Sequence, residues 1–159
     1  MWLRLLILFL LFGFLGISQT SFLAHFDIMG ATLNIVFILF FLVVFFEDSQ
    51  KYIQGIFSAI TAGFFLDIIS SSYFGGAIVL LLIITFIMKH LLSLLKKTKD
   101  KHPVVYFVPL FILSLFIFNL PLIISHLGWV FLIEIFYNLV FALFGFYLFK
   151  TLKLYEFEK

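Results

Sequence analysis

The stretch FGGAIVLLLIITFIMKHLLSLLKKTKDKHP, residues 74–103, decides the fold class of this chain. It is an apolar run from Phe74 to Leu95, and it ends in a cluster of lysines: Lys96, Lys97, Lys99 and Lys101. An α-helix needs about 20 apolar residues to cross the hydrocarbon core of a bilayer. Lysine and arginine gather on the cytoplasmic side of such helices. The stretch therefore predicts a transmembrane helix that ends in the cytoplasm.

The composition of the whole chain supports this reading. Of its 159 residues, 65% are hydrophobic and only 11% are charged. Soluble globular chains are about half apolar and about one quarter charged. A soluble enzyme and a nucleic-acid-binding module are therefore excluded. The chain has no cysteine, so disulfides, thiolate nucleophiles and cysteine-ligated metals are excluded as well.

Apolar runs of spanning length recur along the chain, and their connectors are too short for a soluble domain. We therefore predict an all-α, polytopic integral membrane protein with six transmembrane helices in a single domain, residues 1–159. The first run lacks a small-residue cleavage site, so it is read as an uncleaved helix. The predicted spans are Leu3–Leu23, Ile28–Phe46, Tyr52–Ser70, Phe74–Leu95, Val104–Ser125 and Trp129–Phe149.

The basic residues give the orientation of this arrangement. With six spans, every lysine and the single arginine fall on one side of the membrane. By the positive-inside rule that side is the cytoplasm, so both chain ends are expected inside (N-in/C-in). The residues concerned are Arg4, Lys51, Lys89, Lys96, Lys97, Lys99, Lys101, Lys150, Lys153 and Lys159.

Two of the runs carry small and polar residues at helical spacing. Small residues at every fourth position let two helix backbones approach closely in lipid. We therefore take these stripes as candidate helix-packing or partner-contact faces. The third run carries Gly55, Ala59, Gly63 and Asp67, and the sixth carries Glu134, Asn138, Ala142 and Gly145.

Asp67 and Glu134 are expected at similar depth near the outer interface, and two interpretations of them remain open. In one, they form a polar or proton-sharing pair, because two close carboxylates raise the pKa of one of them. In the other, Asp67 caps the turn that follows it and Glu134 sits in the wetted start of its helix. The histidines have no zinc-like spacing, so no metal site and no cofactor are predicted.

The segment LNIVFILFFLVVFFEDSQKYIQGIFSAITAGFFLDIISSSYFG, residues 33–75, resembles the bacterial rod shape-determining protein MreD family. That family has an Asn followed by an apolar run, a short polar connector and a Gly-rich helix. A Leu-Asp-x-x-Ser-x-x-x-Phe/Leu-Gly segment comes next. In this chain the last segment is Leu66, Asp67, Ser70, Phe74 and Gly75, and Tyr137-Asn138 continues the likeness weakly.

The resemblance implies a non-catalytic scaffold subunit of the cell-elongation complex, which makes peptidoglycan and sets rod shape. The implied location is the cytoplasmic membrane of a bacterium, where membrane lipid surrounds the chain. Its implied partners are the bitopic protein MreC and, through it, MreB, RodA and a class B penicillin-binding transpeptidase. The family also looks similar in fold to the S-components, the substrate-binding subunits of energy-coupling factor vitamin transporters.

The sequence also leaves two alternatives to a scaffold function. A small-molecule-binding transporter subunit would place its pocket near Asp67, Glu134 and Asn34, although transporters usually carry more polar residues at midplane. An intramembrane enzyme would need a nucleophile and a base at one depth. The carboxylate pair is the only candidate for such a set, so we expect no enzyme.

Overall fold

The computed structural model describes residues 2–28, 30–48, 51–69, 74–95, 103–120 and 129–152, and the regular structure within these ranges is helical. Six α-helices and one short 3-10 helix lie in this part of the chain. They are α1 (Trp2–Ser21), η1 (Leu23–Phe26), α2 (Ile35–Phe46), α3 (Ile53–Ile69), α4 (Gly76–Leu95), α5 (Pro103–Phe118) and α7 (Trp129–Thr151).

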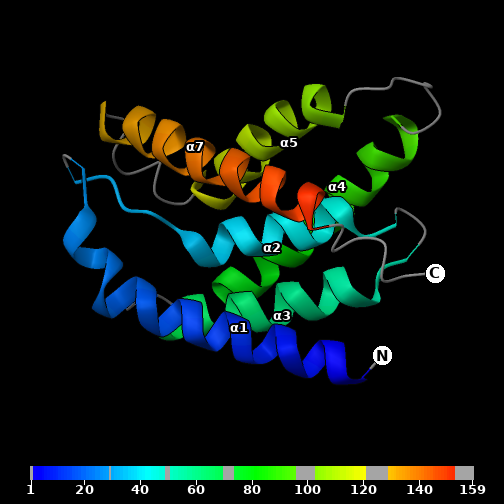
Figure 1. The fold of residues 1–159 in the computed structure, drawn as a ribbon, viewed down its shortest axis with the longest axis horizontal. Helices are drawn as coiled ribbons and strands as arrows, with labels where there is room; N and C mark the ends of the chain where they lie inside the picture. Colours follow the sequence, from blue (N-terminus) through cyan, green and yellow to red (C-terminus); the bar gives the residue numbers. More distant parts are fainter. Residues whose placement is uncertain are drawn as a thin grey trace.

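α2 lies at the centre of a helical bundle (Figure 1). α1 and α3 pack on one side of α2, and α7 packs on the other. α4 crosses α3 and also touches α2, while α5 packs against α4 and α7. The helices alternate in direction, so that α1 begins and α7 ends at the same end of the bundle. We call this the Lys89 end, because it holds Lys89, and we call the opposite end the Asp67 end.

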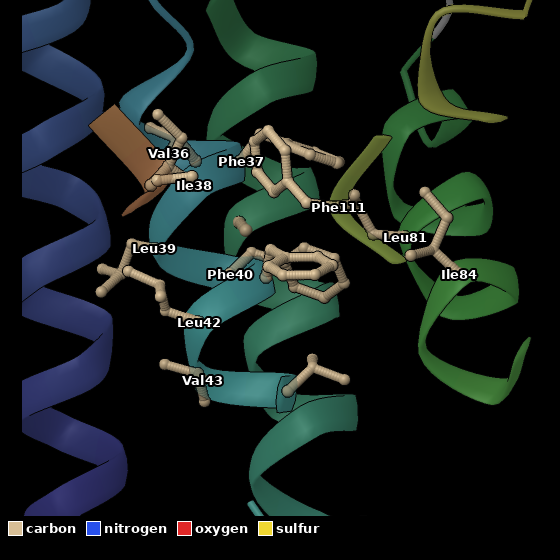
Figure 2. Packing of buried hydrophobic residues seen from close by; sticks show 14 of the residues in the cluster. Val36, Phe37, Ile38, Leu39, Phe40, Leu42, Val43, Leu81, Ile84 and Phe111 are labelled. Carbon is tan, nitrogen blue, oxygen red and sulfur yellow. The ribbon is translucent and has the colours of Figure 1, made fainter. Parts of the chain in front are cut away.

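The central position of α2 follows from its sequence. All twelve residues of this helix are apolar, and every side chain from Val36 to Val44 is buried. A helix that is hydrophobic all round has no face for water and is buried in the middle of its fold. Figure 2 shows Phe37 pointing toward Phe111 of α5, and the Leu42 side chain lies against Gly145 of α7.

Phenylalanine rings join α2 to α5. The Phe37 and Phe41 rings meet the Phe111 ring edge-on, with centroids 6.0 and 5.0 Å apart. Phe41 also meets Phe107 edge-on, at 5.3 Å. Edge-to-face pairs of this kind contribute about 0.5–1.5 kcal/mol each beyond the area that they bury. The α2–α5 contact is therefore directional as well as apolar.

The outer helices present large apolar side chains to their surroundings. Trp2 and Phe14 of α1 are 81% and 68% exposed, and Phe136 of α7 is 70% exposed. Many large apolar side chains exposed on the same helices are typical of a membrane or partner contact. Three helices, α1, α4 and α7, are long and apolar enough to cross a membrane, whereas α2, α3 and α5 are apolar but shorter. These features are those of a membrane protein.

The second predicted span differs from the observed helix at its start. A helix was expected from Ile28, but α2 begins only at Ile35. Ile28 and Ala31 instead exchange backbone hydrogen bonds around Gly30, whose φ of 84° is left-handed. Asn34 then caps α2, because its side chain accepts from the Phe37 N–H at 3.0 Å. The turn and the cap together prevent an earlier helical start.

The other predicted spans lie within a few residues of the observed helices where the structure describes them. The fifth was expected to reach Ser125, but α5 ends at Phe118 and residues 121–128 lie outside the described ranges. The lysine cluster at 96–101 and the basic residues Lys153 and Lys159 also lie outside these ranges.

Candidate functional site

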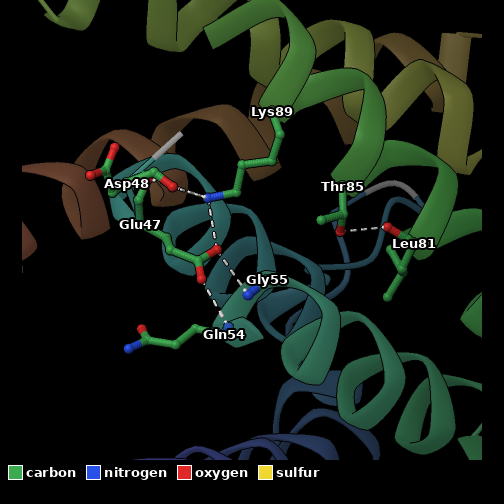
Figure 3. A network of polar contacts seen from close by, with 7 residues as sticks. All are labelled: Glu47, Asp48, Gln54, Gly55, Leu81, Thr85 and Lys89. Carbon is green, nitrogen blue, oxygen red and sulfur yellow. Dashed lines mark hydrogen bonds and ion pairs between the residues drawn. The ribbon is translucent and has the colours of Figure 1, made fainter. Parts of the chain in front are cut away.

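A buried ion pair joins the α2–α3 connector to α4 (Figure 3). The Lys89 Nζ lies 2.7 Å from the Glu47 Oε2, and the two side chains are 0% and 1% exposed. The same ammonium group donates to the carbonyl oxygens of Glu47 and Asp48, at 3.3 and 3.0 Å. Lys89 therefore holds both the side chain and the backbone of the segment that follows α2.

The Glu47 carboxylate also caps the start of α3. Its Oε1 accepts from the Gln54 N–H at 2.8 Å, and its Oε2 accepts from the Gly55 N–H at 2.9 Å. The first N–H groups of a helix have no partner within the helix, and the partial positive charge there favours an anion. A Cβ at position 55 would lie 2.8 Å from the Glu47 Oε2, so the glycine makes room for this carboxylate.

Each charge of the pair thus faces the helix end of opposite partial charge. The carboxylate lies against the N–H groups of α3, and the ammonium lies against the carbonyls that follow α2. Breaking a buried pair by removing one partner costs about 3–5 kcal/mol, because the other charge is left uncompensated. The pair is therefore a strong constraint on the Lys89 end of the bundle.

The sequence reasoning did not find this pair. It placed Lys89 among the topogenic bases and treated Glu47 as part of a polar connector. The available signal was a lysine six residues before the end of the apolar helix α4. An ionisable residue inside a spanning helix usually faces protein and has a partner. That rule gives Lys89 a partner, but it does not say which of the acidic residues it is.

Asp67 lies at the other end of α3, where it caps α4. Its Oδ2 accepts from the Gly75 N–H at 2.8 Å and its Oδ1 from the Ala77 N–H at 2.9 Å. Gly75 has a φ of 97°, a left-handed conformation that glycine adopts at no steric cost. The structure thus gives Asp67 the role of a cap on the turn that follows it, which is one of the two interpretations considered for this residue.

The small-residue stripe of α3 lies inside the chain. A Cβ at Gly63 would lie 2.5 Å from the Cα of Ile78 in α4, so the two backbones nearly touch there. Gly55 and Ala59 are buried on the same helix. The stripe of α7 behaves similarly, because a Cβ at Gly145 would lie 2.7 Å from the Leu42 side chain. Both stripes pack against neighbouring helices of this chain.

Asn138 of α7 holds the segment that leads into α2. Its Oδ1 accepts from the Asn34 N–H at 2.8 Å. Its Nδ2 donates to the carbonyl oxygens of Thr32 at 3.2 Å and Glu134 at 2.9 Å. The Asn138 side chain is fully buried, and unpaired backbone groups would be costly in such a place. Asn138 therefore anchors the start of the central helix.

The two predicted carboxylate partners have separate contacts. The Glu134 Oε1 lies 3.5 Å from the Asn119 Nδ2 at the end of α5, whereas Asp67 accepts only from Gly75 and Ala77 in the described part of the chain. No hydrogen bond joins Asp67 to Glu134 there. Of the motif turn, Phe74 is 69% exposed and its ring packs edge-on against Phe64, and Ser70 lies outside the described residues.

One buried hydroxyl remains without a hydrogen-bond partner in the described ranges. It is the Oγ of Ser58, a fully buried residue of α3 that follows Gly55 by one helical turn. Across these same ranges, no three His, Asp or Glu side chains are grouped as a metal ion would require. The charged helix caps of Glu47 and Asp67, the Asn138 cluster and this hydroxyl are therefore the polar features considered for a function.

Comparisons with known proteins returned no match. Neither a protein-family model, nor a curated protein, nor a solved structure is similar to this chain.

Proposed function

We propose that this chain is a non-catalytic membrane subunit of the bacterial cell-elongation machinery with an MreD-like role. In this proposal it acts as a scaffold in the cytoplasmic membrane and binds a bitopic MreC-like protein through its spanning helices. Through that partner it would join MreB, RodA and a class B penicillin-binding transpeptidase in peptidoglycan synthesis and the control of rod shape.

The observation that carries the proposal is the structural use of the residues that give the MreD resemblance. Asn34 caps α2, while Asp67 and Gly75 together form the turn into α4. These positions fix helix ends in the fold, so a family that shares the fold would need the same residue types. Their polar groups are engaged with backbone N–H groups, which supports a structural role for them.

We further propose six spans with both chain ends in the cytoplasm. Arg4 at the start of α1, Lys51 just before α3 and Lys150 near the end of α7 belong to one end of the bundle. The positive-inside rule assigns such an end to the cytoplasm. The short helices α2, α3 and α5 would then cross the membrane packed against α1, α4 and α7.

The partner helix is proposed to lie on the exposed face of α1 or α7. The small-residue stripes of α3 and α7 are already occupied by Ile78 and Leu42. The residues left outward are large and apolar, such as Phe14 on α1 and Phe136 on α7. Helix association in lipid depends on van der Waals packing, which faces of this kind can provide.

Photo-crosslinking together with depletion tests the proposal. A crosslinking residue at Phe14 or at Phe136 should capture an MreC-like bitopic protein in intact cells. The same residue at Val36, which is fully buried, should capture nothing and serves as the matched control.

Depletion of the chain in its own rod-shaped host should yield round cells. Unchanged cell shape without any capture from either helix would refute the proposed function.

A further inference from the structure

The end of α2 and the start of α3 meet the side of α4 at the Glu47–Lys89 pair. Glu47 is the residue that ends α2, its carboxylate caps α3, and its charge partner belongs to α4. Figure 3 shows the Lys89 side chain reaching from α4 to the Glu47 and Asp48 carbonyls and to the Glu47 carboxylate. Separating the pair would therefore remove the polar contacts that join α4 to the end of α2 and, through the Glu47 carboxylate, to the start of α3.

The surroundings of the pair also fix which position carries the negative charge and which carries the positive charge. A carboxylate faces the N–H groups of α3, and an ammonium faces backbone carbonyl oxygens. Exchanging the two charges would place an ammonium against N–H donors and a carboxylate against carbonyl acceptors. Each of these arrangements is repulsive. An ordinary ion pair tolerates exchange of its charges, whereas this one should not.

The interior behind the pair holds a polar group that water would satisfy. The Ser58 Oγ is buried without a hydrogen-bond partner in the described part of the chain, one turn further along α3 than Gly55. A buried hydroxyl without a partner is unfavourable compared with a hydrated one. Water that reached Ser58 from the Lys89 end would therefore stabilise an open form of the bundle.

We propose that the Glu47–Lys89 pair is a polarity-locked latch, which keeps the buried face of α3 closed to water at the Lys89 end. When the pair is broken, the Lys89 turn of α4 separates from the start of α3 and water reaches Ser58. The latch is a property of this chain alone, so its test is independent of the proposed MreC-like partner.

The test uses one thiol as a reporter, because the chain has no cysteine of its own. Ser58→Cys is close to isosteric and places the thiol behind the latch. Its rate of reaction with a small cationic thiosulfonate is measured in lipid nanodiscs. The parent is Ser58→Cys alone, and His90→Cys, at an exposed position next to Lys89, is the accessible control. Helical circular dichroism and gel filtration monitor the fold of every variant.

Three changes are made in the Ser58→Cys background. Glu47→Gln with Lys89→Met removes both charges and leaves neither of them unpaired. Glu47→Lys with Lys89→Glu exchanges the charges. Gly55→Ala keeps both charges but displaces the carboxylate, because its Cβ would lie 2.8 Å from the Glu47 Oε2.

We expect the thiol to react at least about tenfold faster in the neutral and the exchanged variants, because the rate follows the population of the open form. Gly55→Ala should give a smaller increase. The latch is overturned if the neutral variant stays as protected as the parent, or if the exchanged pair restores protection. If the neutral variant does not fold, the Gly55→Ala variant decides the test. A folded Gly55→Ala variant whose thiol reacts as slowly as that of the parent also overturns the latch.

Discussion

At the scale of single residues, Asp67 gives the sharpest prediction. Its two oxygens accept from Gly75 and Ala77, and its side chain is nearly buried. Asp67→Ala leaves both N–H groups without an acceptor, which should destabilise the fold by about 1–3 kcal/mol. Asp67→Asn retains one acceptor oxygen, so it should destabilise the fold less than Asp67→Ala does. Thermal unfolding midpoints in detergent should therefore rank wild type above Asn, and Asn above Ala.

A neighbouring residue controls for the loss of side-chain volume. Ile68 follows Asp67 in α3, but it is 58% exposed. Ile68→Ala should shift the unfolding midpoint much less than Asp67→Ala does. If the two variants unfold at the same temperature, the hydrogen bonds of Asp67 contribute nothing measurable and its role as a cap is wrong.

At the scale of elements, the helices differ in how far the sequence predicts them. The run at 74–95 is long and mostly apolar, and α4 begins within two residues of its predicted start. The start of α2 was misplaced by seven residues, because hydropathy continues through Ile28 while Gly30 and Asn34 set the backbone. Apolar composition finds a helix, but turns and caps decide where it begins.

The candidate site was predictable in part for a similar reason. A cap by Asp67 is a local contact, and the residues of the following turn suggest it. The Glu47–Lys89 contact joins residues 42 apart in the sequence and exists only because α4 crosses the start of α3. The crossing of the two helices cannot be predicted from one sequence, so the partner of Lys89 could not be predicted either.

The close contact of α3 with α4 predicts opposite effects for two glycines. At Gly63, a Cβ would lie 2.5 Å from the Cα of Ile78, which is backbone and cannot move aside. Gly63→Ala should therefore destabilise the protein by about 1–3 kcal/mol, as overpacking does. Gly76 begins α4 with no atom within 4 Å of its would-be Cβ. Gly76→Ala should be neutral or stabilise by up to about 1 kcal/mol through helix propensity.

Unfolding of both variants in the same detergent checks this contrast. Gly63→Ala should unfold at lower temperature than the wild type, and Gly76→Ala should not. A Gly63→Ala variant that is as stable as the wild type would mean that α3 and α4 lie further apart than the structure places them.

At the scale of the whole molecule, the two ends of the bundle differ in charge chemistry. The Lys89 end carries Arg4, Lys51 and Lys150 as well as the buried pair. The Asp67 end carries the caps of α2 and α4 and the Asn138 cluster. In a membrane, backbone groups at helix ends must find partners within the protein. The Glu47 and Asp67 carboxylates supply such partners at the starts of α3 and α4.

This asymmetry predicts which end of the bundle faces outward. Asp27 follows η1 at the Asp67 end, Asp48 follows α2 at the Lys89 end, and both are exposed. In the cysteine-free chain, Asp27→Cys should react with a membrane-impermeant maleimide added to intact cells. Asp48→Cys should react only after the membrane is permeabilised, because the positive-inside rule places that end in the cytoplasm. Labelling of Asp48→Cys in intact cells would reverse the orientation, and labelling of both thiols would contradict a single bundle that spans the membrane.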